Sequence, residues 1–374
     1  MRTFSPAAVP AGARTLEGHW YHSEAVFQRE RERIFSRGWT CVERSERVSR
    51  AGDYLLAEVD GESLIVLRDV RGELRAFYNV CRHRGTRLCS AQAGRLKGAI
   101  VCPYHAWTYA LDGSLLVARD AEGTLDVEGE RYALRIASVA ERLGFVFVSL
   151  DGDAQPFEAA FPGLAGRFDA WNVGSLRAVR RIEYELLCNW KLVFQNYSEC
   201  YHCPVIHPQV ERLSPSDSGR NDLVEGPVLG GYSSLREAVT SFTASGRMVR
   251  PALPGLAAPD LGRVYFYTIF PSLLLSLHPD YAMAHYVTPL AAGRTRVVCE
   301  WLFEPNTAAH ADFDPADAID FWDLTNRQDW AVNELTQLGV ASRAYAPGPY
   351  VQREGLLYAF DRHYRSVMKE TAAE

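Results

Sequence analysis

Two short segments, each with one cysteine and one histidine, constrain the fold of this chain more than any other feature. Cys81 and His83 are separated by one residue and Cys102 and His105 by two, and 18 residues lie between the two segments. Each segment places a thiolate and an imidazole on a tight turn, so the two loops can converge on one centre. The four residues therefore predict a metal site that two loops share.

Two kinds of metal centre fit these ligands. The residues could bind a structural zinc ion in a tetrahedral site with two cysteines and two histidines. They could instead hold a 2Fe–2S cluster of Rieske type, in which the cysteines bind one iron and the histidines the other. Zinc fingers usually pair like ligands within a segment, whereas here each loop contributes one ligand of each kind. This mixed pairing favours the cluster.

A second group of ligand-type residues lies in the segment NWKLVFQNYSECYHCPVIHP. We expect a helix over residues 191–202, in which Glu199 and His202 share one face. His207 follows five positions after His202, so both can reach one metal only if the helix ends between them, where Pro204 supplies a break. Two imidazoles and a carboxylate with open positions form the ligand set of oxygen-activating Fe(II).

The remaining pattern indicates an α+β chain. Residues 39–150 predict a compact β domain, because GESLIVLRD, ELRAFYNV and GFVFVSL are rich in β-branched and aromatic residues. Residues 263–303 predict several antiparallel strands, and residues 315–340 predict a long amphipathic helix. Residues 215–262 are rich in glycine, proline and serine, and we expect them to form a long irregular insertion.

The first group closely resembles the cluster-binding segment of the Rieske non-haem iron oxygenases. The residues that carry the resemblance are NVCRHRGTRLC and IVCPYHAWTYALDGSL. It implies a Rieske 2Fe–2S cluster, with Cys81 and Cys102 on one iron and His83 and His105 on the other. The resemblance covers nearly the whole chain and identifies it as a terminal oxygenase (alpha) subunit.

The same resemblance implies roles for the second group. The family pattern of a carboxylate, two residues, a histidine, four residues and a histidine matches Glu199, His202 and His207. The histidines would bind a mononuclear Fe(II). Glu199 would not be a ligand, but would bridge a cluster histidine of one subunit to an iron histidine of the next by hydrogen bonds.

The third iron ligand is expected far downstream, on the predicted helix that contains NRQDWAVNELTQLG. Asp329 matches the position of the family's carboxylate ligand by its surroundings. Asp323 and Glu334 lie on the same helix and are the alternatives, because either of them could face the metal instead.

The resemblance also implies a domain order. Residues 1–38 would be an N-terminal helical segment of the catalytic domain, residues 39–150 the Rieske domain, and residues 151–374 the catalytic domain with the mononuclear iron. The catalytic domain would pack an antiparallel sheet against the long helix, in the helix-grip manner. The Rieske β domain would thus be inserted into the catalytic domain.

Glu199 marks a subgroup within the family. Most members that hydroxylate aromatic rings carry aspartate there, and glutamate resembles the enzymes that act on glycine betaine, choline, carnitine or proline betaine. A quaternary ammonium group is bound by aromatic faces. The candidates in the predicted strands are Tyr265, Tyr267, Phe270, Tyr281, Tyr286 and Trp301. Half of the aromatic residues in alternating strands face the core, so a cage and plain packing remain alternatives.

The expected reaction uses O₂ and electrons from NAD(P)H to hydroxylate or N-demethylate such a compound. The chain has no G-x-G-x-x-G or flavin-binding segment, so a separate reductase or ferredoxin would supply the electrons. The resemblance also implies a homotrimer. An aromatic-ring-hydroxylating dioxygenase or monooxygenase is one alternative, and a Rieske electron carrier without oxygenase activity is another.

Composition limits the binding partners and the cellular compartment that we expect for the protein. Forty basic and 46 acidic residues give a net charge of −6, which provides no electrostatic case for binding nucleic acid or an anionic membrane. No apolar run is long enough for a membrane span, and the N-terminus does not resemble a secretory signal. Eight cysteines are too few for a disulfide scaffold. We therefore expect a cytoplasmic protein without disulfides.

Overall fold

The computed structural model describes residues 5–121 and 129–368. They divide into two units, one formed by Met1–Glu30 with Glu158–Glu374 and the other by Arg31–Phe157. Each unit is described by itself. The domain boundaries expected from the sequence, at residues 38 and 150, stay a prediction.

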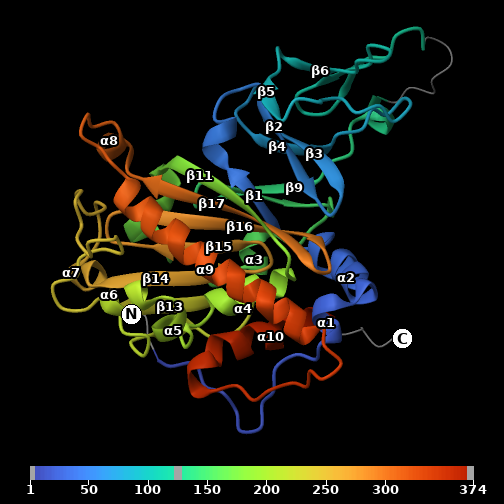
Figure 1. Ribbon diagram of the computed structural model, residues 1–374. Helices are drawn as coiled ribbons and strands as arrows, with labels where there is room; N and C mark the ends of the chain where they lie inside the picture. Colours follow the sequence, from blue (N-terminus) through green and yellow to red (C-terminus); the bar gives the residue numbers. More distant parts are fainter. Residues whose placement is uncertain (1–4, 122–128, 369–374) are drawn as a thin grey trace. The chain divides into compact units, whose positions relative to one another are not determined.

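The smaller unit consists of three small antiparallel sheets (Figure 1). The four-stranded sheet has the order β4-β3-β2-β5, with the bounds Leu74–Tyr78, Glu62–Arg68, Asp53–Val59 and Ala93–Arg95. The second has the order β1-β10-β9, with the bounds Thr40–Arg44, Phe145–Ser149 and Ser138–Arg142. The third has the order β6-β7-β8, with the bounds Ala99–Val101, Thr108–Ala110 and Leu115–Val117.

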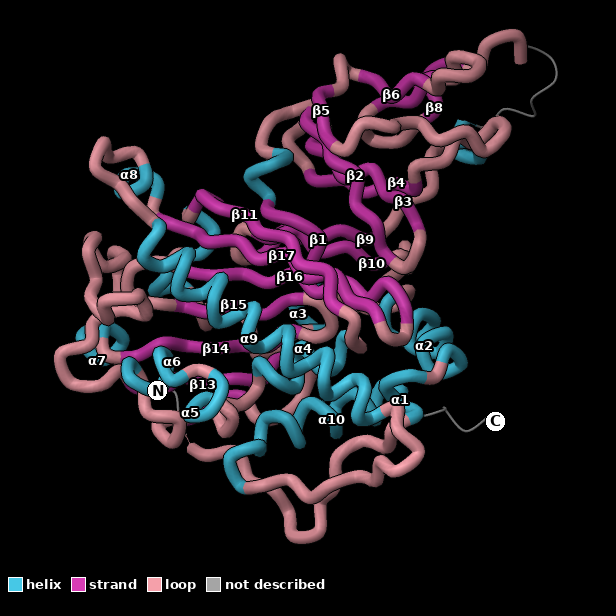
Figure 2. The backbone as a smooth tube through the Cα atoms, viewed as in Figure 1, coloured by secondary structure: helices cyan, strands magenta, loops and turns pink. Residues whose placement is uncertain are grey.

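The larger unit is built on a seven-stranded antiparallel sheet, whose strands are magenta in Figure 2. Its order is β11-β17-β16-β15-β14-β13-β12. The bounds in that order are Arg177–Leu186, Arg294–Phe303, Ala282–Ala291, Leu273–Leu277, Arg263–Ile269, Val228–Ser234 and Arg220–Leu223. Every residue of the central strand β15 is buried, so the middle of this sheet is the core of the unit.

Helices cover this sheet. The longest is α9 (Ala316–Val340), which is joined to the sheet by hydrogen bonds from Tyr184 of β11 to Asp323 and between His285 of β16 and Asn326. Helix α4 (Trp190–Tyr197) contacts α9, β16 and α10 (Gly355–Met368). The other α-helices are α1 (His19–His22), α2 (Glu24–Glu30), α3 (Phe157–Ala160), α5 (Cys203–Ile206), α6 (Pro208–Leu213), α7 (Ala258–Leu261) and α8 (Pro305–Ala308).

Short irregular helices complete the described chain. A π-helix, η1, spans Arg31–Phe35. The 3-10 helices are η2 (Ser45–Val48), η3 (Gly129–Tyr132), η4 (Asp169–Trp171), η5 (Val173–Ser175) and η6 (Gln352–Glu354). Among residues 5–121 and 129–368, none of the helices combines the length and apolar character that a bilayer span requires.

The α+β class, the four strands within 263–303 and the long helix near 315–340 are confirmed. The expectation of an irregular stretch over 215–262 is wrong where β12, β13 and α7 lie, and is confirmed for residues 235–257, which contain no helix or strand. Strand β13 contains Gly230 and Gly231, which have low strand propensity. A Cβ at Gly231 would overlap the backbone carbonyl of Arg220 in the neighbouring strand, so close strand packing explains the glycine.

Candidate metal centres and the adjoining cavity

The two Cys–His segments form loops with matching backbone geometry. In the loop after β4, the amide of Gly85 donates to the carbonyl of Cys81 at 3.0 Å. In the loop between β6 and β7, the amide of Ala106 donates to the carbonyl of Cys102 at 3.1 Å. Both donor residues have positive φ, +74° at Gly85 and +59° at Ala106, which reverses the chain direction in each loop.

The loops bring their histidine rings together. The ring centroids of His83 and His105 lie 4.8 Å apart. Cys81 and Cys102 are buried in the same hydrophobic cluster. Within the described part of the chain, the buried Nδ1 atom of His105 has no hydrogen-bond partner. Two buried thiols, two adjacent imidazoles and an unsatisfied ring nitrogen fit a Rieske cluster.

Two neighbours of these loops were not identified from the sequence. The Tyr109 hydroxyl accepts a hydrogen bond from the amide of Arg82 at 3.0 Å and lies 3.4 Å from Sγ of Cys81, so its own proton can point at the sulfur. The Asn79 side chain accepts from the amides of Leu88 and Cys89, each at 2.9 Å. Asn79 thus ties the end of the first loop to its start.

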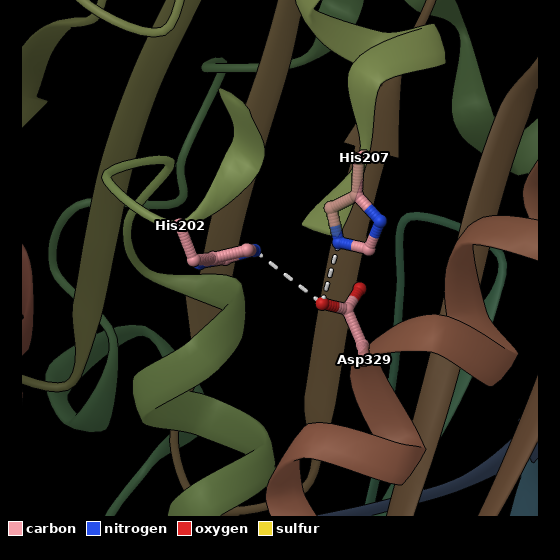
Figure 3. Close-up of side chains that lie close together, drawn as sticks. All are labelled: His202, His207 and Asp329. Carbon is pink, nitrogen blue, oxygen red and sulfur yellow. Dashed lines mark hydrogen bonds and ion pairs between the residues drawn. The ribbon is translucent and has the colours of Figure 1, made fainter. Parts of the chain in front are cut away.

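The second group of ligands converges in the larger unit. His202 lies just before α5, His207 lies between α5 and α6, and Asp329 projects from α9 (Figure 3). Oδ1 of Asp329 is 2.8 Å from Nε2 of His207 and 3.4 Å from Nε2 of His202. One ligand atom from each residue lies within 4.8 Å of the others, as a single metal ion requires.

Hydrogen bonds fix the orientation of both imidazoles. Nδ1 of His202 is 2.6 Å from a carboxylate oxygen of Glu199, and Nδ1 of His207 is 2.8 Å from the amide oxygen of Gln328. Because each oxygen is an acceptor, each Nδ1 carries a proton. Each Nε2 faces Asp329, to which it donates a hydrogen bond when protonated, and its lone pair would bind a metal ion when the proton leaves. Gln328, which the sequence reasoning missed, is the residue directly before Asp329.

The charges at this site favour the binding of a cation. Burial alone would lower the pKa of His202, but hydrogen bonds to Asp329 and Glu199 outweigh it and raise the pKa to about 10. Burial would raise the pKa of Asp329, yet the hydrogen bonds from His202 and His207 lower it. The carboxylates therefore favour a positive charge between the rings, and a divalent cation would take the place of the proton.

The other two candidate ligands on α9 have different partners. Asp323 accepts a hydrogen bond from the hydroxyl of Tyr184 at 2.6 Å and one from Arg327 at 3.0 Å. Glu334 accepts from the backbone amide of Leu187 at 2.9 Å. Of the three candidates, the structure brings only Asp329 to the two histidines.

The local structure around Glu199 differs from the expected helix. Helix α4 ends at Tyr197, so Glu199 and His202 lie in the following turn and share no helical face. Pro204 does not break a helix between the two histidines, because it lies in the first turn of α5, where proline is tolerated. The Glu199 carboxylate accepts from the backbone amides of Tyr201 and His202 and thereby holds the turn.

The expectation of a chain without disulfides is also wrong. Cys200 and Cys203 are joined by a disulfide across this turn, with 4.9 Å between their Cα atoms. The expectation was based on the cellular compartment, whereas a turn brings two cysteines three positions apart within bonding distance. The other six cysteines are buried.

A cavity of about 370 Å³ adjoins the three converging residues. His202, His207 and Asp329 line it together with aromatic residues from several elements, namely Tyr197, Tyr232, Phe242, Phe266 and Trp322. Four of the rings form a continuous wall, because the centroid distances are 5.9 Å for Tyr197–Phe266, 6.2 Å for Phe266–Trp322 and 5.6 Å for Trp322–Phe242.

The aromatic residues predicted to bind substrate lie elsewhere. Tyr265, Tyr267, Phe270 and Tyr281 are buried and do not line this cavity, and neither do Tyr286 and Trp301. Strand alternation explains the difference in β14, where Phe266 faces the cavity while its neighbours Tyr265 and Tyr267 pack against Trp171 and Phe168. Tyr281 accepts a hydrogen bond from the Trp322 indole and lies behind that ring.

Comparisons with known proteins agree with this geometry. Residues 173–370 match the family of ring hydroxylating alpha subunits (catalytic domain), and residues 38–127 match the Rieske [2Fe-2S] domain. The chain is 30% identical to the glycine betaine monooxygenase oxygenase subunit of Chromohalobacter salexigens, over 91% of this chain and 82% of that protein. It is 39% identical to the carnitine monooxygenase oxygenase subunit of Acinetobacter baumannii, over 90% and 88%.

A solved structure is similar over the full length. The quaternary ammonium Rieske monooxygenase CntA, in complex with an inhibitor, superimposes with a TM-score of 0.81 and 27% identity. The match covers 98% of this chain and 100% of that chain. The same protein has been solved with its substrate L-carnitine.

Proposed function

The chain belongs to the Rieske non-haem iron oxygenases as an oxygenase (alpha) subunit, and from this premise we propose that it hydroxylates a small quaternary ammonium compound. A Rieske 2Fe–2S cluster and a mononuclear iron are the cofactors of this family. Cys81, Cys102, His83 and His105 would hold the cluster. His202, His207 and Asp329 would hold the mononuclear iron, which when bound supplies the activation of O₂.

One observation carries the choice of substrate: the three proposed iron ligands and the wall of aromatic rings line the same cavity. The face of an aromatic ring attracts a cation, and the attraction is stronger where water is excluded. A trimethylammonium group held against Phe266 and Trp322 would place a carbon bonded to nitrogen beside the iron site. The names of the relatives support the same substrate class.

Two arginines favour a betaine over choline. Arg220 and Arg353 line the cavity. A guanidinium group can bind a carboxylate through two parallel hydrogen bonds, and choline has no carboxylate. We therefore expect a substrate with an ammonium group and a carboxylate, of the size of glycine betaine or carnitine.

The chemistry follows from where the oxygen atom enters. Insertion into a C–H bond next to the ammonium nitrogen gives a hydroxylated carbon on that nitrogen. The C–N bond then breaks, the electron pair stays on nitrogen, and the products are a tertiary amine, an aldehyde and one proton. Attack on an N-methyl group releases formaldehyde, which is N-demethylation.

As an oxygenase subunit of a multicomponent system, the chain depends on a separate source of electrons. We infer that a reductase or ferredoxin supplies these electrons from NAD(P)H and that the protein is cytoplasmic. We also infer a homotrimer, in which Glu199 connects the cluster of one subunit to the iron of the next. The hydrogen bond of Glu199 to His202 is the half of this bridge that lies within one chain.

Oxygen uptake tests the proposal. The purified protein, with NADH and a reductase, would be given glycine betaine, carnitine, choline and simple aromatic acids, and formaldehyde, tertiary amine and hydroxylated ring products would be measured. We expect oxygen uptake and C–N cleavage with a betaine. Hydroxylation of an aromatic acid, with no product from any ammonium compound, would replace the proposal by a ring-hydroxylating oxygenase.

A variant tests the aromatic wall. Trp322→Leu removes a ring from the cavity, and the exposed Leu324 on the same helix provides the control Leu324→Ala. We expect a higher KM for the ammonium substrate with Trp322→Leu and a smaller change for a neutral analogue with carbon in place of nitrogen, since only the cation loses the attraction to the ring. Equal changes for both compounds would rule out a cation–π role for Trp322.

A further inference from the structure

We propose that Cys200 and Cys203 form a redox-active dithiol–disulfide site in the cavity wall, and that its state controls how firmly His202 holds the mononuclear iron. The second part rests on His202 being an iron ligand, as the proposed function has it. The two cysteines enclose Tyr201 and His202 in a C-x-x-C segment, a spacing typical of redox-active cysteine pairs.

The disulfide closes a turn that the iron-site histidine occupies. Glu199 anchors this turn from its start through the amides of Tyr201 and His202, and the disulfide crosses it. Sγ of Cys203 is 3.9 Å from Nε2 of His202, and the same nitrogen is 3.4 Å from Oδ1 of Asp329. A change at the sulfur atoms therefore occurs in van der Waals contact with the ring that would bind iron.

The location of the pair makes it open to a reductant. Both cysteines line the cavity, and Cys200 is partly exposed, whereas Cys203 and the other six cysteines are buried. The partner we infer is a dithiol. Its thiolate attacks Sγ of Cys200, which forms a mixed disulfide and releases Cys203 as a thiolate that takes up a proton. The second thiol then releases Cys200, and two electrons and two protons have moved to the protein.

The consequence for iron follows from chain entropy. With the disulfide intact, the turn has few conformations, so His202 loses little freedom when it binds a metal. After reduction the turn is restrained by the Glu199 hydrogen bonds and by the backbone hydrogen bond from the amide of Cys203 to the carbonyl of Cys200, but by no covalent bond. The ring of His202 then has more conformations to lose when it binds a metal. We therefore expect the reduced protein to lose its mononuclear iron faster than the oxidised protein.

The test uses the iron-loaded, full-length protein under anaerobic conditions. It is incubated with or without dithiothreitol, and free thiols are alkylated and located by mass spectrometry. A ferrous chelator measures the rate of iron release, while the absorption of the Rieske cluster reports that the cluster stays intact. We expect alkylation of Cys200 and Cys203 only after reduction, together with a several-fold faster release of one iron.

Variants distinguish the effect of opening the Cys200–Cys203 disulfide from other effects of dithiothreitol on the protein. The double variant Cys200→Ser/Cys203→Ser should release iron at the fast rate with or without dithiothreitol. Tyr201→Ser changes an exposed residue of the same turn and should respond as the wild type does. Failure of dithiothreitol to open the pair in the folded protein, or equal iron release before and after opening, would overturn the proposal. Neither result depends on which substrate the enzyme oxidises.

Discussion

The two imidazoles of the candidate iron site are held by different acceptors. A charged carboxylate, Glu199, holds the ring of His202, and a neutral amide, Gln328, holds the ring of His207. Gln328 is itself positioned by the side chain of Gln209, which donates to the same oxygen at 2.6 Å. Such acceptors orient a ligand ring and make its free nitrogen more basic, so both residues should affect metal binding without touching the metal.

Gln328→Leu removes the acceptor for Nδ1 of His207. We expect the affinity for ferrous iron at this site to fall by about 10-fold to 100-fold, because the ring is free to rotate. Iron titration of the metal-depleted site measures the change. Gln328→Glu keeps an oxygen at the same place and should retain most of the affinity. If Gln328→Leu bound iron as tightly as the wild type, the orienting role would be refuted.

Glu199→Gln tests the proposed electron bridge. The glutamine oxygen can still accept the hydrogen bond from His202, so we expect both metal centres to be retained. Turnover coupled to NADH oxidation should be lost, because the charged connection between the centres is gone. Iron analysis and the cluster spectrum measure the first result, and product formation per NADH measures the second. Normal turnover in this variant would show that Glu199 is not the bridge.

At the scale of elements, helix α4 positions the start of the ligand turn. The helix begins at a cap, where the side chain of Asn189 accepts from the amide of Lys191 at 3.0 Å. The side-chain amide of Asn189 also donates a hydrogen bond to the carbonyl of Ala292 at 2.6 Å. Asn189 is buried, so both hydrogen bonds lie away from water and link the helix to the end of β16.

Asn189→Ala should therefore destabilise the larger unit. Loss of the cap alone costs about 1 kcal/mol, and the buried carbonyl of Ala292 adds about 1–3 kcal/mol when it loses its donor. Urea denaturation monitored by tryptophan fluorescence measures the decrease in the free energy of unfolding. The exposed Asn306, whose amide donates to Glu304, provides the control Asn306→Ala, which should change stability by less than about 0.5 kcal/mol. Equal effects of both variants would contradict the capping role.

Some elements could be predicted from the sequence and others could not, for physical reasons. The strands within 263–303 are rich in β-branched and aromatic residues, and the buried face of helix α9 carries the large apolar residues Phe321, Trp322 and Trp330. Strand β13 was missed because its two adjacent glycines are required by close packing, of Gly231 to β12 and of Gly230 to β14, which is a tertiary effect. The end of α4 at Tyr197 was missed because Glu199 caps the following turn with its side chain, and a period of 3.6 residues does not reveal that contact.

At the scale of the whole molecule, the candidate site joins distant parts of the chain. His207 and Asp329 are 122 positions apart. Histidine and aspartate are residue types that bind iron, but only the resemblance to the family indicated that these two belong to one site. The aromatic wall could not be predicted, because Phe242 comes from the stretch expected to be irregular and Trp322 from the long helix. The candidate aromatic residues were chosen by composition; strand alternation directs Tyr265 and Tyr267 away from the cavity, and Phe270 and Tyr281 lie just outside the strands.

We propose that this chain holds a mononuclear iron at His202, His207 and Asp329 in addition to its Rieske cluster. Iron analysis of the wild type, Asp329→Ala and the control Asp323→Ala tests it most directly. We expect about three iron atoms per chain in the wild type and the control, and about two in Asp329→Ala with an unchanged cluster spectrum. About two iron atoms in the wild type, or three retained in Asp329→Ala, would contradict the account.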